Sequence, residues 1–167
     1  MMDAAEARNE IRRLMFAYTD ALDGGDLDAV AALFADATVR VDGASGGASG
    51  AVEVREFFSA VTFYKDGDRC DQDDPASTPA TQHLTSNVYI EVDTDGLAAS
   101  ARSRFTVFQA CPNFPLQPII AGRYQDRFEH HNGRWRFTER VEFIDLVADL
   151  AHHLDAEFRQ TTALKIP

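Results

Sequence analysis

The hydrophobic pattern of this 167-residue chain changes its period near residue 80, and this change limits the possible folds more than any other feature. Before residue 80, apolar residues recur every three or four positions, which is the period of a helix with one buried face. After it, they alternate as in a strand. An antiparallel sheet with one apolar face needs a cover, and the N-terminal helices are available. The sequence therefore predicts a single α+β domain over residues 1–167.

The expected helices are residues 4–22, 27–34 and 51–61. The first carries an apolar stripe of Ile11, Leu14, Met15, Tyr18 and Leu22. Gly24 and Gly25 follow it, and glycine tolerates the left-handed backbone with which many helices end. Asp26 is suited to cap the second helix. The first helix therefore ends in a polar segment that includes Asp23.

The expected long strands are residues 83–92, 97–110, 119–131 and 134–145. Asp95-Gly96 and Asn132-Gly133 separate consecutive strands, and such dipeptides are strong signals for tight hairpin turns. The remaining expected segments are a strand at 37–41, loops at 43–50 and 62–79, a proline-rich break at 112–118, and a helix at 146–159. Helices followed by an antiparallel meander leave a concave space, which is a common kind of small-molecule site.

Composition excludes several classes of protein. The net charge is −11, and an acidic surface repels phosphate backbones, so we expect no nucleic-acid partner. No apolar run approaches the roughly 18 residues of a membrane span, so we expect no membrane partner. Cys70 and Cys111 form no CxxC motif, and residues 1–10 do not resemble a signal peptide. These features favour a cytoplasmic protein.

No metal or cofactor is expected. His130 and His131 are adjacent on a strand and would point to opposite faces, while His152 and His153 would diverge on a helix. The acidic run at 66–74 lacks the ligand spacing of an EF-hand. The sequence therefore predicts that any catalysis is carried out by side chains alone.

Three segments carry a resemblance to a known family: ALDGGDLDAVAALFADATV at 21–39, TQHLTSNVYIEV at 81–92 and GRYQDRFEHHNGRWRF at 122–137. Their order and spacing resemble the SnoaL-like branch of the nuclear transport factor 2-like superfamily, which includes scytalone dehydratase and bile-acid 7α-dehydratase. The resemblance implies a cone-shaped, curved antiparallel sheet covered by N-terminal helices. It also implies a homo-oligomer, a dimer or a trimer.

The resemblance further implies a set of catalytic residues. Dehydratases of this branch pair an Asp after the first helix with a His at the start of the first long strand, and the matching residues are Asp23 and His83. The bile-acid enzymes add a Tyr and an Arg, which correspond to Tyr18 and Arg140. Hexachlorocyclohexane dehydrochlorinase uses a similar Asp/His pair, so the pair does not define the leaving group. The pocket Asn of scytalone dehydratase aligns near Tyr124, which makes scytalone a poor substrate candidate.

Elimination of water β to a carbonyl needs a base, an acid and a donor for the enolate oxygen. In our hypothesis His83 serves as acid and base, Asp23 orients it, and Tyr18 and Arg140 bind the substrate oxygen. Alternation would place Asn87 on the same face as His83. The expected substrate-binding residues are Asn87, Phe57, Phe58, Phe105, Phe108 and Tyr124.

Each of these residues also has a purely structural interpretation. His83 is equally suited to a hydrogen bond in the core, Asp23 to capping a turn, and Tyr18 to packing on the helix stripe. Simple alternation places Arg140 with Arg136 on the solvent side of the last strand, and only a bulge would turn it inward.

The sequence therefore favours a cofactor-independent dehydratase that acts on a hydrophobic, oxygenated ring compound such as a steroid or polyketide. One alternative is an isomerase or cyclase in which Asp23 is the base. The other is a non-catalytic module that binds a small ligand, because one fold hosts both kinds of protein.

Overall fold

The computed structural model describes residues 3–44, 46–60, 64–65, 68–69 and 80–153. Its helices are α1 (Ala4–Gly24), α2 (Leu27–Leu33) and α3 (Gly50–Ala60). Its strands are β1 (Thr38–Val41), β2 (Ala48–Ser49), β3 (Tyr64–Lys65), β4 (Asp68–Arg69), β5 (Thr81–Val92), β6 (Ala98–Cys111), β7 (Phe114–His131) and β8 (Arg134–Val147). The expected α+β class is confirmed.

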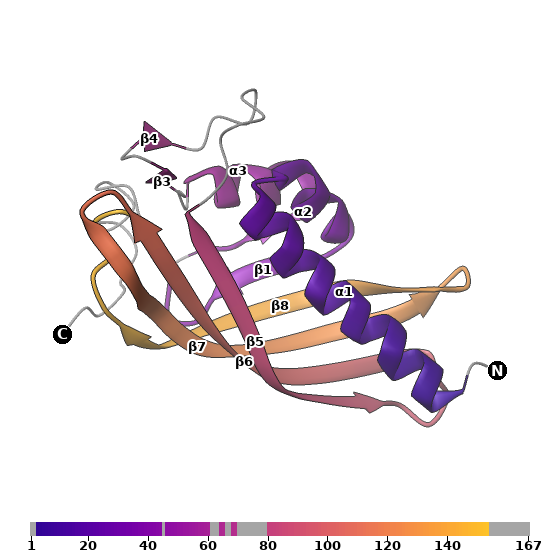
Figure 1. Cartoon of the computed structure of the whole chain (residues 1–167). Coiled ribbons are helices and arrows are strands. Elements are labelled where there is room, and N and C mark those ends of the chain that lie inside the picture. The colour runs from indigo at the N-terminus through magenta and orange to yellow at the C-terminus, as the bar shows by residue number, and fades with distance from the viewer. Residues whose placement is uncertain (1–2, 45, 61–63, 66–67, 70–79, 154–167) are drawn as a thin grey trace.

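Six strands form one open, curved sheet in the order β2-β1-β8-β7-β6-β5. β5 to β8 are the expected antiparallel meander, but β1 runs parallel to β8, so the sheet is mixed rather than wholly antiparallel. Figure 1 shows the three helices on one side of this sheet, with α1 lying across the strands. We call the side that the helices cover the inner face and the opposite side the outer face.

The end of α1 brings its polar residues to the sheet. Ile11, Met15, Tyr18 and Leu22 are buried along the apolar stripe of α1. Gly25 then adopts a φ of 75°, and the backbone N–H of Asp26 donates to the carbonyl of Ala21 at 2.9 Å. This left-handed turn stops α1 and starts α2, as the glycine pair predicted.

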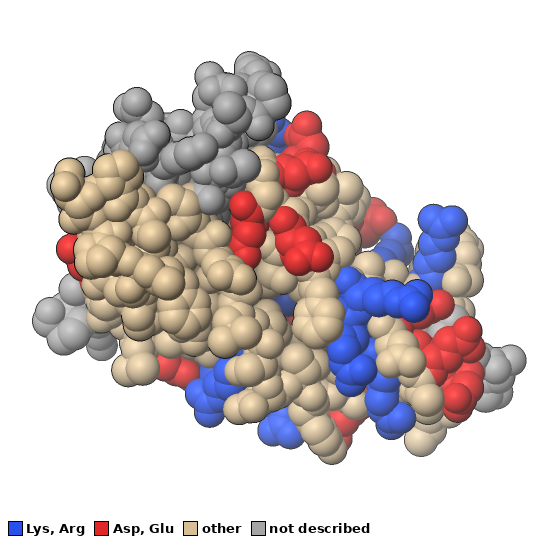
Figure 2. Space-filling model, in the orientation of Figure 1, with Lys and Arg blue, Asp and Glu red and all other residues tan. Residues whose placement is uncertain are grey.

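The surface on the α1 side is unevenly charged. Figure 2 shows Lys and Arg side chains gathered toward the N-terminal half of α1. The end of the sheet at the β6–β7 turn carries few charged groups in the same view, and Leu116 is exposed there.

Two expected segment boundaries are wrong. β7 begins at Phe114 rather than after a break at 112–118, because Asn113 takes a φ of 64° and closes a two-residue turn between Cys111 and Phe114. A proline is tolerated in this strand because Pro118 lies beside an irregularity in the pairing with β6. Leu146 and Val147 continue β8 instead of starting a helix, since both pair with β7.

The expected loops also contain short strands. Ala48–Ser49 pairs with β1, and Tyr64–Lys65 pairs with Asp68–Arg69. The rest of the expected loop at 62–79 and residues 154–159 of the expected last helix lie outside the described residues.

Candidate active site

Asp23 and His83 form a two-point contact between the end of α1 and the start of β5. The Nδ1 atom of His83 lies 2.5 Å from Oδ1 of Asp23, and the backbone N–H of His83 donates to Oδ2 at 2.7 Å. Both carboxylate oxygens are therefore engaged by one residue. With Nδ1–H donating to Asp23, Nε2 is left as the ring atom that faces other partners, and no described residue makes a hydrogen bond to it.

A bulge in β8 turns Arg140 toward the inner face. Phe128 pairs with Phe137 and Arg127 pairs with Glu139, so Thr138 is an extra residue in β8. The extra residue reverses the alternation that follows it. Arg140 is therefore 1% exposed rather than facing solvent, which simple alternation had predicted.

Buried Arg140 is neutralised by Asp126 of β7. Nε and Nη2 of Arg140 donate to the two carboxylate oxygens of Asp126 at 2.8 and 2.9 Å. Burial lowers the pKa of Arg140, but the charge and hydrogen bonds of Asp126, together with smaller contributions from Tyr18 and Tyr124, raise it by more. Nη1 is buried and has no hydrogen-bond partner in the described part of the chain. Arg140 thus keeps one donor for another group.

Aromatic rings surround the Arg140 guanidinium. Its central carbon lies 4.1 Å from the ring centroid of Tyr18 and 4.2 Å from that of Tyr124. Phe34 and Phe137 lie farther away, at 5.9 and 5.0 Å. Ring faces attract a cation, and the attraction is stronger where water is excluded. Arg140 therefore orders the two tyrosines that flank it.

Glu142 lies two residues after Arg140 and on the same face. It pairs with Tyr124 across the β7–β8 ladder, and its Oε1 accepts a hydrogen bond from the Tyr18 hydroxyl at 3.1 Å. Burial raises the pKa of the Glu142 carboxyl, while Arg140, Tyr18 and His83 oppose the rise without cancelling it. Burial likewise raises the pKa of Tyr18, so its hydroxyl stays protonated.

Most of the expected pocket aromatics share this inner face. Phe105 stacks on Tyr124 with ring centroids 4.3 Å apart, and Phe58 contacts the Tyr18 ring edge-on at 5.8 Å. Phe57 is half-buried and lies 5.1 Å from Phe58. These side chains give the inner face flat apolar walls around a few polar groups.

Two expected pocket residues lie on the other side of the sheet. Asn87 has a φ of 51° in a bulge where Ser86 pairs with Arg104 and Tyr89 with Arg102, so the alternation that starts at His83 does not continue through it. Asn87 is exposed on the outer face. Phe108 pairs with exposed Gln82 and also faces outward. Both assignments to the pocket were wrong. Asn87 lies in a bulge, where alternation fails. Phe108 is an odd number of positions from Phe105, so the two side chains point to opposite faces.

The sequence reasoning missed several inner-face residues. His153 is buried, and burial together with the charge of His83 lowers the pKa of His153 to about 3. Gln109 is also buried, and its Nε2 donates to the His152 carbonyl at 2.7 Å. Asp126 carried a detectable signal, since it alternates with Tyr124 and Phe128 as an acid among apolar residues. Glu142 carried none, because its orientation depends on the bulge at Thr138.

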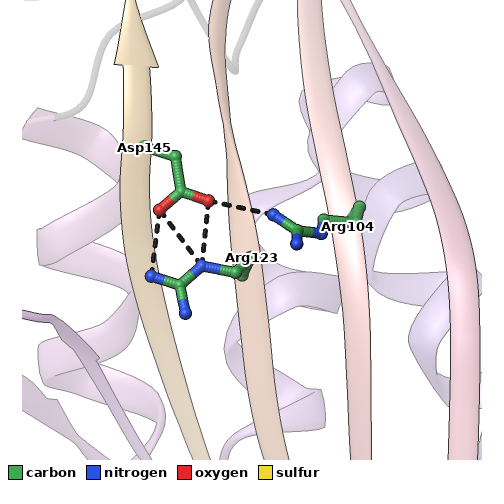
Figure 3. Close-up of polar contacts among 3 residues, drawn as sticks. All are labelled: Arg104, Arg123 and Asp145. Carbon is green, nitrogen blue, oxygen red and sulfur yellow. Dashed lines mark hydrogen bonds and ion pairs between the residues drawn. The ribbon is translucent and has the colours of Figure 1, made fainter.

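The outer face has a different kind of cluster. Asp145 of β8 accepts hydrogen bonds from Arg123 at 2.9 Å and from Arg104 at 3.2 Å, as Figure 3 shows. A hollow of about 440 Å³ adjoins this cluster. Its exposed and half-buried lining residues are Asn87, Tyr89, Arg102, Arg104, Arg123 and Gln125. We call Arg104, Arg123 and Asp145 the outer-face cluster.

The described residues contain no group of three or more His, Cys, Asp or Glu side chains that would hold a metal ion. Among those same residues, no helix has the length and apolar character needed to cross a membrane.

Comparison with known proteins defines the family. The model of the SnoaL-like domain matches residues 3–141, so the chain belongs to the SnoaL-like family within the nuclear transport factor 2-like proteins. No curated protein matches the sequence. The fold is shared with many solved structures, of which three are informative.

A variant of Rv3472 from Mycobacterium tuberculosis, a protein of unknown function, is 26% identical with a TM-score of 0.64, over 83% of this chain and 76% of that one. A proposed scytalone dehydratase from Novosphingobium aromaticivorans is 23% identical with a TM-score of 0.63, over 85% and 86%. LinA is 19% identical with a TM-score of 0.66, over 90% and 93%. The last two similarities establish the fold alone.

Proposed function

We propose that this protein is a cofactor-independent dehydratase, a carbon–oxygen lyase in which His83 takes the proton α to a carbonyl. The observation that carries the proposal is the two-point contact of Asp23 with His83. A carboxylate at Nδ1 fixes the ring tautomer and stabilises the imidazolium that forms when Nε2 accepts a proton. The same imidazolium then returns or passes on that proton.

The contact also weighs against Asp23 as the base, which the isomerase or cyclase alternative requires. Both of its oxygens already accept hydrogen bonds from His83. Both oxygens are therefore directed at His83 rather than at a molecule bound on the inner face. We therefore favour His83 as the acid–base residue and Asp23 as the residue that orients it.

The substrate class follows from the walls of the inner face. Phe58, Phe105 and Tyr124 offer ring surfaces, while Arg140 Nη1 and the Tyr18–Glu142 pair offer polar contacts for a substrate oxygen. This combination suits a flat, hydrophobic compound with few oxygens, such as a steroid or polyketide. A homodimer or homotrimer is part of the proposal, and light scattering of the purified chain tests it.

The test of His83 uses 1-tetralone, an aromatic ketone without a leaving group. Exchange of its α-protons in D₂O, followed by NMR, requires a base and nothing else. We expect the wild type to catalyse exchange and His83→Ala to lose about 10²–10⁴-fold of the rate. The control is His131→Ala, since His131 is exposed in the β7–β8 turn and should exchange like the wild type.

Other results would favour the alternatives. Asp23→Asn abolishing exchange while His83→Ala only reduces it would support Asp23 as the base. Binding of 1-tetralone without any exchange above buffer would support a ligand-binding module, in which the Asp23–His83 contact serves only to attach α1 to β5.

A further inference from the structure

Glu142 carries a carboxyl group on the inner face that is not part of the Asp23–His83 contact. It lies on the inner face beside Tyr18 and Arg140, each of which is 1% exposed. Glu142 itself is only half-buried, so part of it remains accessible on a face where its neighbours are closed off. Its carboxyl lies on the inner face at the Tyr18 hydroxyl, where it can contact a molecule bound on that face.

The charges around Glu142 favour its neutral form. The nearby cation, Arg140, is already paired with Asp126 through two hydrogen bonds. Tyr18 and Tyr124 contribute neutral hydroxyls, while His83 lowers and Asp126 raises the pKa of Glu142. A carboxyl that leaves water without a counter-ion of its own holds its proton more tightly, and the pKa of Glu142 is raised by burial.

His83 and Glu142 face the inside of the cone from separated strands. β7 and β6 lie between β8 and β5 in the sheet, but one helix connects the two groups. Tyr18 of α1 bonds to Glu142, and Asp23 of α1 bonds to His83. The two groups thus approach the same space from two directions. Such an arrangement suits dehydration, because one group can remove the α-proton while the other protonates the hydroxyl that leaves.

We infer that Glu142 is a second catalytic acid, which protonates the leaving hydroxyl while His83 removes the α-proton. The inference rests on the proposed dehydratase function. In the step, His83 Nε2 takes the α-proton, the C–H electrons form the C=C bond, and the β C–O bond breaks. The carboxyl proton of Glu142 joins the departing oxygen, which leaves as water. His83 is then protonated and Glu142 ionised, and proton transfer through solvent restores both.

Tyr18 has a positioning role in this scheme. Its hydroxyl donates to Glu142, and that hydrogen bond lowers the pKa of the Glu142 carboxyl against the effect of burial. Tyr18 therefore sets how readily Glu142 releases its proton. In the structural alternative, Glu142 only accepts the hydrogen bond of the Tyr18 hydroxyl. The tests below distinguish this alternative from a catalytic role.

The test compares two leaving groups that yield one product. 3-Hydroxy-1-tetralone and 3-acetoxy-1-tetralone both give 1-naphthol, which is followed by its absorbance. Hydroxide needs a proton to leave, whereas acetate leaves without one. For Glu142→Gln we expect dehydration of the hydroxy compound to fall about 10²–10⁴-fold and elimination of acetate to fall less than about ten-fold. α-Proton exchange of 1-tetralone should stay at the wild-type rate.

Matched variants define the outcomes. Glu139→Gln makes the same change on the outer side of β8, where Glu139 pairs with Arg127, and should leave all three rates unchanged. Equal losses for both leaving groups in Glu142→Gln, or no loss for either, would overturn the inference. Absence of any His83-dependent exchange in the wild type would instead refute the proposed function, and the role of Glu142 would fall with it.

Tyr18→Phe tests the same point without removing the carboxyl. The variant keeps the ring between Phe58 and Arg140 but deletes the hydrogen bond that lowers the pKa of Glu142. That pKa should rise, so the decline of the dehydration rate at high pH should move to higher pH. No movement, or movement to lower pH, would show that Glu142 is not the acid.

Discussion

The two faces of one sheet treat charge in opposite ways. On the inner face, Arg140 and Asp126 are buried and meet in a single bidentate pair. On the outer face, Arg123 and Arg104 share Asp145 (Figure 3), and all three side chains are partly exposed to water. Water screens the outer-face cluster, so its pairs contribute little to stability. Water does not screen the buried inner pair, and the geometry of this pair fixes the position of the groups around it.

The largest predicted effect comes from breaking the inner pair. Asp126→Ala leaves the Arg140 cation buried and uncompensated, and should lower the free energy of unfolding by about 3–5 kcal/mol. The matched variant Asp145→Ala removes an acceptor of two arginines on the outer face and should shift the urea midpoint far less. Equal shifts of the two urea midpoints would contradict the distinction between the faces.

A smaller effect is expected at Gly122, where the inner face has no spare room. A Cβ at Gly122 would lie 2.0 Å from the Phe143 carbonyl oxygen and 2.9 Å from the Phe105 ring. Gly122→Ala should therefore lower the free energy of unfolding by about 1–3 kcal/mol through overpacking. Gly24→Ala is the control, because nothing lies within 4 Å of its Cβ, and thermal unfolding should show no loss there.

The smallest effect concerns the pH dependence of stability. The pKa of Glu142 is raised on folding, so its contribution is complete below its unfolded pKa of about 4.3 and is lost as the pH rises through the folded pKa. Glu142→Gln cannot ionise and escapes this loss. At pH 8 we therefore expect its Tm to exceed the wild-type value. At pH 4 the advantage should vanish, and a constant advantage would argue against titration of Glu142.

The regular parts of the fold were predictable because they depend on local patterns. The apolar stripe and the glycine pair gave α1 to within two residues of its observed end at Gly24. Asn132-Gly133 forms the expected turn, with φ values of 50° and 79°. The strand that carries His83 begins two residues earlier than expected, at Thr81. Each of these features is encoded within a few neighbouring residues.

The orientation of side chains beyond a bulge was not predictable. Thr138 and Asn87 are extra residues only with respect to the partner strand, so no local pattern in β8 or β5 reveals them. Arg140 and Glu142 turn inward because of the first bulge, and Asn87 and Tyr89 face outward because of the second. The candidate site was therefore predicted where family resemblance supplied Asp23 and His83. The predicted site lacked Glu142 and Asp126, whose orientation depends on the pairing of β8 with β7.

The contact between Asp23 and His83 spans 60 residues of sequence and joins the helical layer to the sheet. Closing a chain segment of that length has an entropic cost, and local helix formation does not offset this cost. The pair therefore forms when α1 docks against β5. The rate at which His83-dependent proton exchange recovers during refolding would consequently report the rate at which the two layers dock. A catalytic assay would thus measure a folding step.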